Sequence, residues 1–277
     1  MIAIISVLAT LLCSALPAAK RRADSAHCTS NQRQVQLAIQ LFVVDNERFP
    51  IGNTSSDLSA ARFWINDAED YSKSKWPRNN LTKRLQPTGL FVCPSYNRVS
   101  GYYLNTATPI PFGAYGYNYF GVGGGIPVKV SSSGSSFYYK GFPGLGLGGE
   151  LPADKEEVVS GMPFKSDYRA IREAAVLAPS DMISIGDSTI ADALLDSKQL
   201  GTIDISAGPR IMKFVLKDAT DTASARAMRS RHSGKEITSF VDGHVESSPI
   251  EQVFDPRQPE RARRWNNDNR PHAERSQ

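Results

Sequence analysis

The side chains best suited to chemistry in this sequence stand near residue 240. Nine residues separate His232 from Asp242, and Gly243 and His244 follow. Imidazole and carboxylate groups are common zinc ligands and common acid–base pairs in enzymes. The residues between them predict a strand from 235 to 241, which would hold His232 and Asp242 about 20 Å apart. We therefore expect structural roles: His232 fastens the loop before the strand, while Asp242 and Gly243 form a two-residue type I′ hairpin turn.

The cysteines are a second candidate for chemistry. Cys13 lies in the apolar leader, whereas Cys28 and Cys93 lie in the soluble part. An oxidising compartment would permit a disulfide between Cys28 and Cys93, which would close a long loop and stabilise the fold by about 4 kcal/mol. Two buried free thiols are the alternative, and the residues alone leave both open. None of the cysteine spacings is the CxxC of a metal site.

A glycine-rich segment, GLGLGG at residues 144 to 149, formally contains the G-x-G-x-x-G pattern of dinucleotide-binding proteins. The context does not fit, because no strand is predicted before it and Pro152 follows where a helix should begin. We expect this segment to belong to a flexible surface insertion over about residues 121 to 165. Ser188 likewise lacks the surroundings of a nucleophilic serine.

The element that must position these groups is a long N-terminal helix. Residues 1 to 19 contain no charged side chain, and as a helix they would span about 28 Å, roughly one hydrocarbon core. A spanning anchor, a cleaved signal peptide and a buried core helix compete here; SALPAA resembles a cleavage site, but no basic residue precedes the apolar stretch. Residues 20 to 48 predict an amphipathic continuation, because Val35, Ile39 and Phe42 recur at helical spacing.

Six segments spread along the chain carry a family resemblance. They are the N-terminal helix up to Pro50, FVCPSYN (91–97), AYGYNYFGVG (114–123), LAPSDMISIGDS (177–188), RHSGKEITSFVDGHVE (231–246) and WNNDNRPH (265–272). In this order they resemble the bacterial prepilin-type proteins of planctomycete and verrucomicrobial type, which are related to the pseudopilins of type II secretion. The fifth segment carries the His, nine residues, Asp-Gly spacing after which the family's C-terminal domain is named, at His232, Asp242 and Gly243.

This resemblance implies a structural subunit of a type II secretion or type IV pilus-like system, and not an enzyme. It also implies a single-pass anchor in the bacterial inner membrane, a globular part in the periplasm or on a filament, and partners among other pseudopilin subunits and secretion-platform proteins. The major pseudopilins hold a structural calcium ion in a C-terminal loop, for which Asp268, Asn266 and Asp242 are the candidate ligands here. Otherwise the resemblance implies no cofactor.

The resemblance has one gap, at the N-terminus. The family's basic leader, its glycine and the Phe-Thr-Leu-Ile-Glu stretch do not appear in this sequence, and Met1 stands where the family has valine. We therefore expect either a start at an internal codon or a truncated chain, without a prepilin-peptidase site.

Together these features predict an α+β fold of the pilin-like kind, in which a long N-terminal helix packs on a small antiparallel sheet with long loop insertions. The sheet is expected near residues 90–120, 182–187, 210–217 and 236–247, within a globular domain from 49 to 250. Residues 251 to 277 are expected to be a polar basic tail. The net charge of +4 is scattered, which argues against a nucleic-acid partner.

An alternative function is a membrane-anchored periplasmic module that binds a ligand such as a glycan, or an enzyme on the same anchor. Its site would be an aromatic cluster formed by Tyr115, Tyr117, Tyr119 and Phe120.

Overall fold

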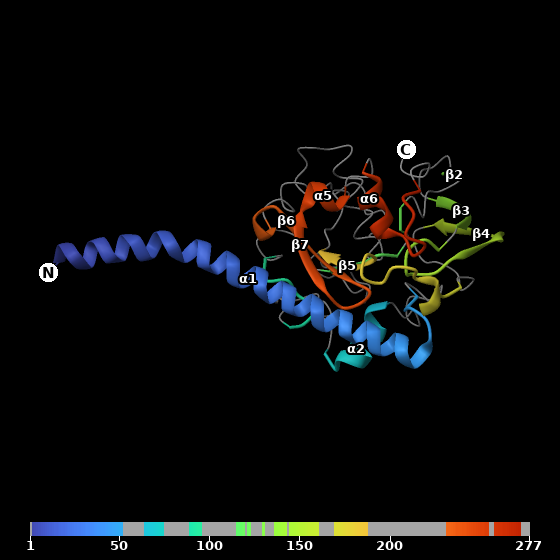
Figure 1. Cartoon of the computed structure of the whole chain (residues 1–277), viewed down its shortest axis with the longest axis horizontal. Helices are drawn as coiled ribbons and strands as arrows, with labels where there is room; N and C mark the ends of the chain where they lie inside the picture. The colour runs from blue at the N-terminus through green and yellow to red at the C-terminus, as the bar shows by residue number, and fades with distance from the viewer. Residues whose placement is uncertain are drawn as a thin grey trace.

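The computed structural model describes residues 2–51, 64–74, 89–95, 115–119, 121–122, 129–130, 136–142, 144–160, 169–187, 231–254 and 258–272. Its longest element is helix α1, Ile2–Asn46, which continues through Pro17. The first half of α1 projects away from the globular head, and the second half lies along it (Figure 1). The turn of the chain follows at once, because Glu47 has a φ of 55° and the buried Phe49 donates its main-chain N–H to Ile171 O.

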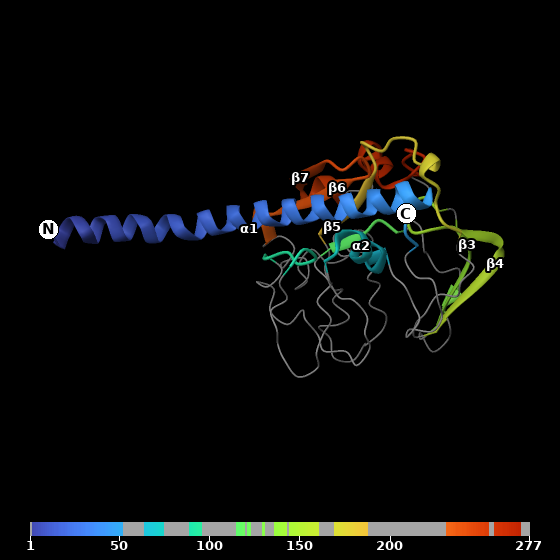
Figure 2. The same cartoon turned by 90° about the horizontal axis from the view of Figure 1, so that it is seen from below.

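The second half of α1 is amphipathic in the expected way. Its buried residues recur every three or four positions, at Cys28, Gln32, Val35, Ile39 and Phe42. This spacing places them on one stripe of a helix with 3.6 residues per turn. The stripe faces a sheet on one side and the short helix α2, Trp64–Ser72, on another (Figure 2).

That sheet has four antiparallel strands in the order β1-β5-β6-β7. They are β1 (Tyr115–Tyr117), β5 (Ile183–Asp187), β6 (Lys235–Phe240) and β7 (Val245–Pro249). The prediction of an α+β chain with a long N-terminal helix on a small antiparallel sheet is therefore confirmed. Of the four sheet segments expected from the sequence, residues 210–217 lie outside the described part of the chain.

A second antiparallel sheet corrects the predicted loop insertion at about 121 to 165. It is formed by β2 (Lys129–Val130), β3 (Ser136–Phe142) and β4 (Leu151–Ser160), in the order β2-β3-β4. The many Ser and Gly residues of this region favoured a loop in the sequence prediction. The structure has a hairpin there, whose strands are long enough to pair over several residues.

The glycine-rich segment is also not a flexible surface loop, because residues 144 to 149 are all buried. Gly148 packs so closely on Tyr119 that an added Cβ would stand 1.7 Å from a ring carbon of that side chain. Leu147 lies in the core, and its main-chain N–H bonds Asn118 O. The glycines thus serve close packing and not flexibility.

The C-terminal segment predicted as a polar tail is part of the head. It contains α5 (Ile250–Phe254), α6 (Pro259–Ala262) and the 3-10 turn η6 (Arg263–Trp265), and Trp265, Asn266 and Asn267 are buried. Asn267 Nδ2 donates to the oxygens of Gly144 and Gly146, so this segment closes over the glycine-rich one. Two further 3-10 turns, η2 (Glu173–Ala175) and η5 (Arg231–Ser233), precede β5 and β6.

The sequence predicts that residues 1 to 19 cross a membrane. Among the residues that the structure describes, no helix combines the length and apolar character that a bilayer span requires.

Candidate functional site

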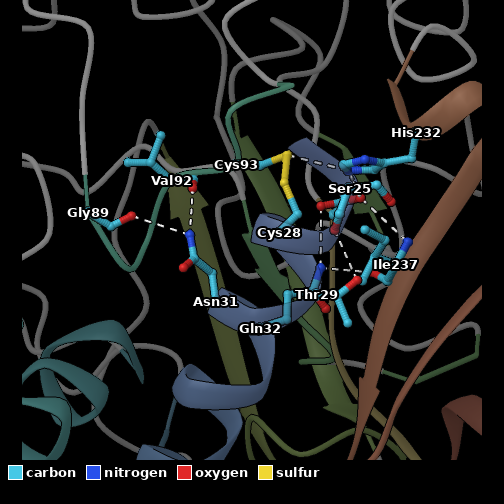
Figure 3. The surroundings of a disulfide bond; sticks show 11 residues. Ser25, Cys28, Thr29, Asn31, Gln32, Gly89, Val92, Cys93, His232 and Ile237 are labelled. Atoms are coloured by element: carbon cyan, nitrogen blue, oxygen red, sulfur yellow. Dashed lines mark hydrogen bonds and ion pairs between the residues drawn. A yellow bond between two sulfur atoms is a disulfide. The ribbon is translucent and has the colours of Figure 1, made fainter. Parts of the chain in front are cut away.

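A disulfide and a buried histidine–aspartate pair meet where α1 packs on the four-stranded sheet. Cys28 on α1 and Cys93 in the 89–95 segment form a disulfide, with Cα atoms 5.1 Å apart. Both cysteines are fully buried. Asn31, one turn further along α1, donates its side-chain amide to Val92 O at 2.9 Å, so a hydrogen bond as well as the disulfide holds the segment to the helix (Figure 3).

His232 points its imidazole at this disulfide (Figure 3). Its Nε2 lies 3.4 Å from Cys93 Sγ and 3.0 Å from Asp187 Oδ2. The residue sits in η5 with φ 43° and ψ 29°, a left-handed conformation that histidine adopts more readily than most residues. Its Nδ1 is buried and has no hydrogen-bond partner among the described residues. A neutral His232 therefore carries its proton on Nε2, where Asp187 accepts it.

Asp187 completes the group, and the sequence analysis did not identify it. It is the last residue of β5 and is buried. Gln32 Nε2 donates to its Oδ1 at 3.3 Å, and the main-chain N–H of Ile237 donates to its Oδ2 at 3.4 Å. A buried carboxylate requires such donors. The available signal was a single acidic residue ending the otherwise uncharged run MISIGD.

We call Cys28, Cys93, Asp187 and His232 the junction cluster. Its members come from α1, the 89–95 segment, β5 and η5, so it ties four parts of the chain together. Because all four side chains are buried, the cluster in this conformation does not meet a substrate from solution. Its arrangement is that of a structural cross-link between these four parts of the chain.

Asp242 and Gly243 lie at the other end of β6 from His232, and they have different partners. Asp242 Oδ1 accepts from His244 N at 3.1 Å and pairs with His244 Nδ1 at 2.6 Å. Gly243 has φ 97°, whereas Asp242 does not have a positive φ, so the predicted two-residue type I′ turn is wrong. Gly243 N–H donates to Phe240 O, and Phe240 N–H to His244 O, as in a three-residue hairpin loop that ends in a left-handed glycine.

The surface beside this turn holds a charged pair. Arg264 Nη2 donates to Glu246 Oε2 at 2.8 Å. Partial burial by itself raises the pKa of the Glu246 carboxyl, but the hydrogen bond and charge of Arg264, with His244, outweigh burial and hold that pKa below its usual value. Arg264 also lies over the ring of Phe240, 4.5 Å from its centroid.

The three candidate calcium ligands are committed to other contacts. Asn266 Oδ1 accepts from Val122 N at 2.8 Å, and the two oxygens of Asp268 accept from Arg270 N and pair with His272 Nε2. Asp242 is held by His244. Within the described ranges, the group of His, Cys, Asp and Glu side chains close enough to share a metal ion is Cys28, Cys93 and His232, and neither Asp242 nor Asp268 belongs to such a group.

The aromatic cluster proposed for a ligand-binding module is part of the core. Tyr115, Tyr117 and Tyr119 are buried, and Phe120 lies outside the described residues. Tyr117 stacks on Trp64 of α2, with ring centroids 5.2 Å apart, and burial raises the pKa of its phenol well above the usual value. The expected surface platform for a glycan is therefore not formed by these three tyrosines.

Comparison with known proteins adds no relative: no family model, no curated protein and no solved structure matches this chain.

Proposed function

We propose that this protein is a structural subunit of a pseudopilin-like assembly, in which the projecting half of α1 packs against the same helix of neighbouring copies. The observation that carries the proposal is the exposure of large apolar side chains on that half. Ile5, Leu12 and Leu16 are 61%, 67% and 64% exposed. Burying one such side chain contributes about 1.5–3 kcal/mol, so a helix that presents several of them favours association.

The spacing of these residues supports helix-to-helix packing. Leu12 follows Ile5 by seven residues and Leu16 follows Leu12 by four, which are about two turns and one turn of helix. They therefore lie on one stripe, as in helices that pack side by side. We call Ile5, Leu12 and Leu16 the projecting stripe.

The second half of α1 supports the same role from the other side. Beyond the apolar contacts, Gln36 and Gln40 donate their side-chain amides to Val241 O, and the Cys28–Cys93 disulfide joins the helix to the 89–95 segment. A head fixed this firmly to a rod moves with it, which is the property that a filament subunit needs. Secretion-platform proteins and the inner membrane remain predicted partners.

The test compares one charged substitution on the stripe with the same change on the opposite face of the helix. Leu12→Asp places a carboxylate in the projecting stripe, whereas Ser14→Asp places one two residues away, about 200° around the helix. We expect the full-length chain to sediment as an oligomer, Leu12→Asp to sediment as a monomer, and Ser14→Asp to behave as the wild type.

Two results would overturn the proposal. The first is a wild-type chain that stays monomeric at high concentration, or an equal loss of association in Leu12→Asp and Ser14→Asp. The second is a chain that binds neutral phospholipid vesicles and stays monomeric on them as well as in solution, which would assign the projecting stripe to lipid alone.

A further inference from the structure

We propose that the junction cluster is a zinc site in the reduced protein: when the Cys28–Cys93 disulfide is open, Cys28, Cys93, His232 and Asp187 bind one Zn²⁺ ion. This inference is independent of the proposed assembly, because it concerns the interior of the head.

The donor atoms already lie close together. The sulfurs of Cys28 and Cys93 and a ring nitrogen of His232 all lie within 4.8 Å of one another. His232 Nε2 is 3.4 Å from Cys93 Sγ and 3.0 Å from Asp187 Oδ2. Donors bound to one tetrahedral Zn²⁺ stand roughly 3.3–3.8 Å apart, given metal–ligand distances of about 2.0–2.3 Å. Once the S–S bond opens, these three donors need only small shifts, whereas Asp187 lies outside this group of three and must move its carboxylate closer to the sulfurs.

The chemical types of the donors also suit zinc. Two thiolates, one imidazole and one carboxylate are all zinc ligands, and here the carboxylate takes the place of the second imidazole of a four-coordinate Cys₂His₂ structural site. The set is buried, so no position is left open for a substrate. Zn²⁺ would also neutralise most of the negative charge of two buried thiolates and the Asp187 carboxylate, which would otherwise be costly to bury together.

Outer contacts hold the Asp187 ligand, whereas the buried Nδ1 of His232 has no hydrogen-bond partner among the described residues. Gln32 Nε2 and the Ile237 N–H hold the two oxygens of Asp187, and outer contacts of this kind orient metal ligands. The left-handed conformation of His232 aims its ring at the sulfurs. Metal binding at Nε2 moves the imidazole proton to Nδ1.

The chemistry balances with a dithiol as the reductant. The dithiol transfers two electrons and two protons to the Cys28–Cys93 bond, which yields two cysteine thiols and an oxidised, cyclic disulfide of the reductant. Zn²⁺ then displaces the two thiol protons as it binds. The S–S bond joins α1 to the 89–95 segment, and the ion would join both of them to η5 as well.

The experiment refolds the reduced full-length chain, since the buried site takes up its ion as the chain closes. All proteins carry Cys13→Ser, which removes the exposed free thiol. The disulfide is opened in the test with a phosphine and water, which yield the same two thiols and the phosphine oxide, and the probe is Co²⁺ or Zn²⁺ alone. We expect one metal ion per chain, a thiolate-to-cobalt charge-transfer band with the strong visible bands of tetrahedral Co²⁺, and protection of both thiols from alkylation. The oxidised protein should bind no metal at this site.

Matched variants then assign the ligands. His232→Ala should lose the tetrahedral cobalt spectrum, whereas His244→Ala, which removes the half-exposed histidine of the β6–β7 turn, should keep it. Asp187→Asn preserves shape and should lower zinc affinity by at least tenfold. Circular dichroism would reveal whether His232→Ala folds. If it does not fold, the zinc affinity of Asp187→Asn decides whether the junction cluster binds the ion.

Three results would overturn the proposal. They are a reduced chain that binds no cobalt, equal cobalt binding by the wild type and His232→Ala, and unchanged zinc affinity in a folded Asp187→Asn protein.

Discussion

Gln32 on α1 donates its side-chain amide to the main-chain oxygen of Ile237 on β6, at 2.9 Å. Gln36 and Gln40 repeat this contact one and two turns further on, and both donate to Val241 O. Side-chain amides that meet particular main-chain oxygens add to the apolar packing in fixing the position of the helix along the sheet, because a hydrogen bond depends on both distance and angle. The direction in which the projecting half of α1 leaves the head follows from these contacts.

Gln32→Leu should therefore destabilise the head by about 1–3 kcal/mol, because it leaves buried oxygens of Ile237 and Asp187 without a donor. Urea unfolding at equilibrium measures the change. Gln34→Leu is the matched control, since Gln34 is exposed and, among the described residues, bonds Ser30 of its own helix. Its expected effect is within about 0.5 kcal/mol. Equal effects of the two substitutions would remove the special role of Gln32.

Loss of the disulfide is predicted to cost about 4 kcal/mol. The bond joins residues 65 apart in sequence, and closing a loop of that length lowers the entropy of the unfolded chain by this amount in the chain-entropy model. The comparison is between wild type and Cys28→Ala with Cys93→Ala, both in a chelator so that no ion replaces the bond. Cys13→Ala should leave the free energy of unfolding unchanged, as Cys13 is exposed. A double variant as stable as the wild type would contradict the prediction.

The contact between Gly148 and Tyr119 predicts a cost for the smallest possible side chain. Gly148→Ala should destabilise the protein by about 1–3 kcal/mol, because the new methyl group would overlap the Tyr119 ring. A double-mutant cycle with Tyr119→Ala isolates the cause: once the ring is removed, the same substitution should cost at least about 1 kcal/mol less. If the effects of Gly148→Ala and Tyr119→Ala on the free energy of unfolding are purely additive, the overlap with the Tyr119 ring is not the cause.

The helix and the hairpin could be predicted because their signals are local. Val35, Ile39 and Phe42 recur at the helical period, and Asp242-Gly243 marks the hairpin between β6 and β7. Even there, local signals fixed the hairpin but not its turn type. The bonds from His244 to the Asp242 side chain favour a longer loop in which only Gly243 is left-handed.

The junction cluster could not be predicted in full, because its contacts join distant residues. His232 and Cys93 are 139 residues apart, and Gln32 and Asp187 are 155 apart. No periodicity relates such positions. The prediction of a flexible loop for the glycine-rich segment was wrong for a related reason. Whether a glycine serves flexibility or close packing depends on its neighbour in space, here Tyr119.

The Glu246–Arg264 pair predicts a dependence of stability on pH. The pKa of Glu246 is lower in the folded protein than in the unfolded chain. The unfolded chain therefore binds more protons in this range, so the contribution is complete above the ordinary carboxyl pKa and is lost as the pH falls through the lower, folded value. Glu246→Gln should reduce the fall in melting temperature between neutral pH and pH of about 3. Glu173→Gln, at an exposed carboxylate of η2, is the control and should leave that fall as in the wild type.

The exposed apolar residues of α1 do not end with the projecting stripe. Leu37, Leu41 and Val44 are 54%, 46% and 70% exposed on the face of α1 that points away from the sheet. Leu37 follows Leu16 by 21 residues, close to six turns, so it continues the same stripe. If neighbouring copies pack along the whole rod, Leu41→Glu should weaken self-association about tenfold, equivalent to about 1.4 kcal/mol of lost apolar burial.

Sedimentation of the full-length chain over a range of concentrations measures this change. Leu177→Glu is the matched control, because Leu177 is 70% exposed on the head and away from α1 in sequence. Both variants should keep the wild-type free energy of unfolding within about 0.5 kcal/mol, since neither side chain belongs to the core. If Leu41→Glu associates as strongly as Leu177→Glu, the contact between copies is confined to the projecting stripe, and the heads stand apart from the neighbouring helix.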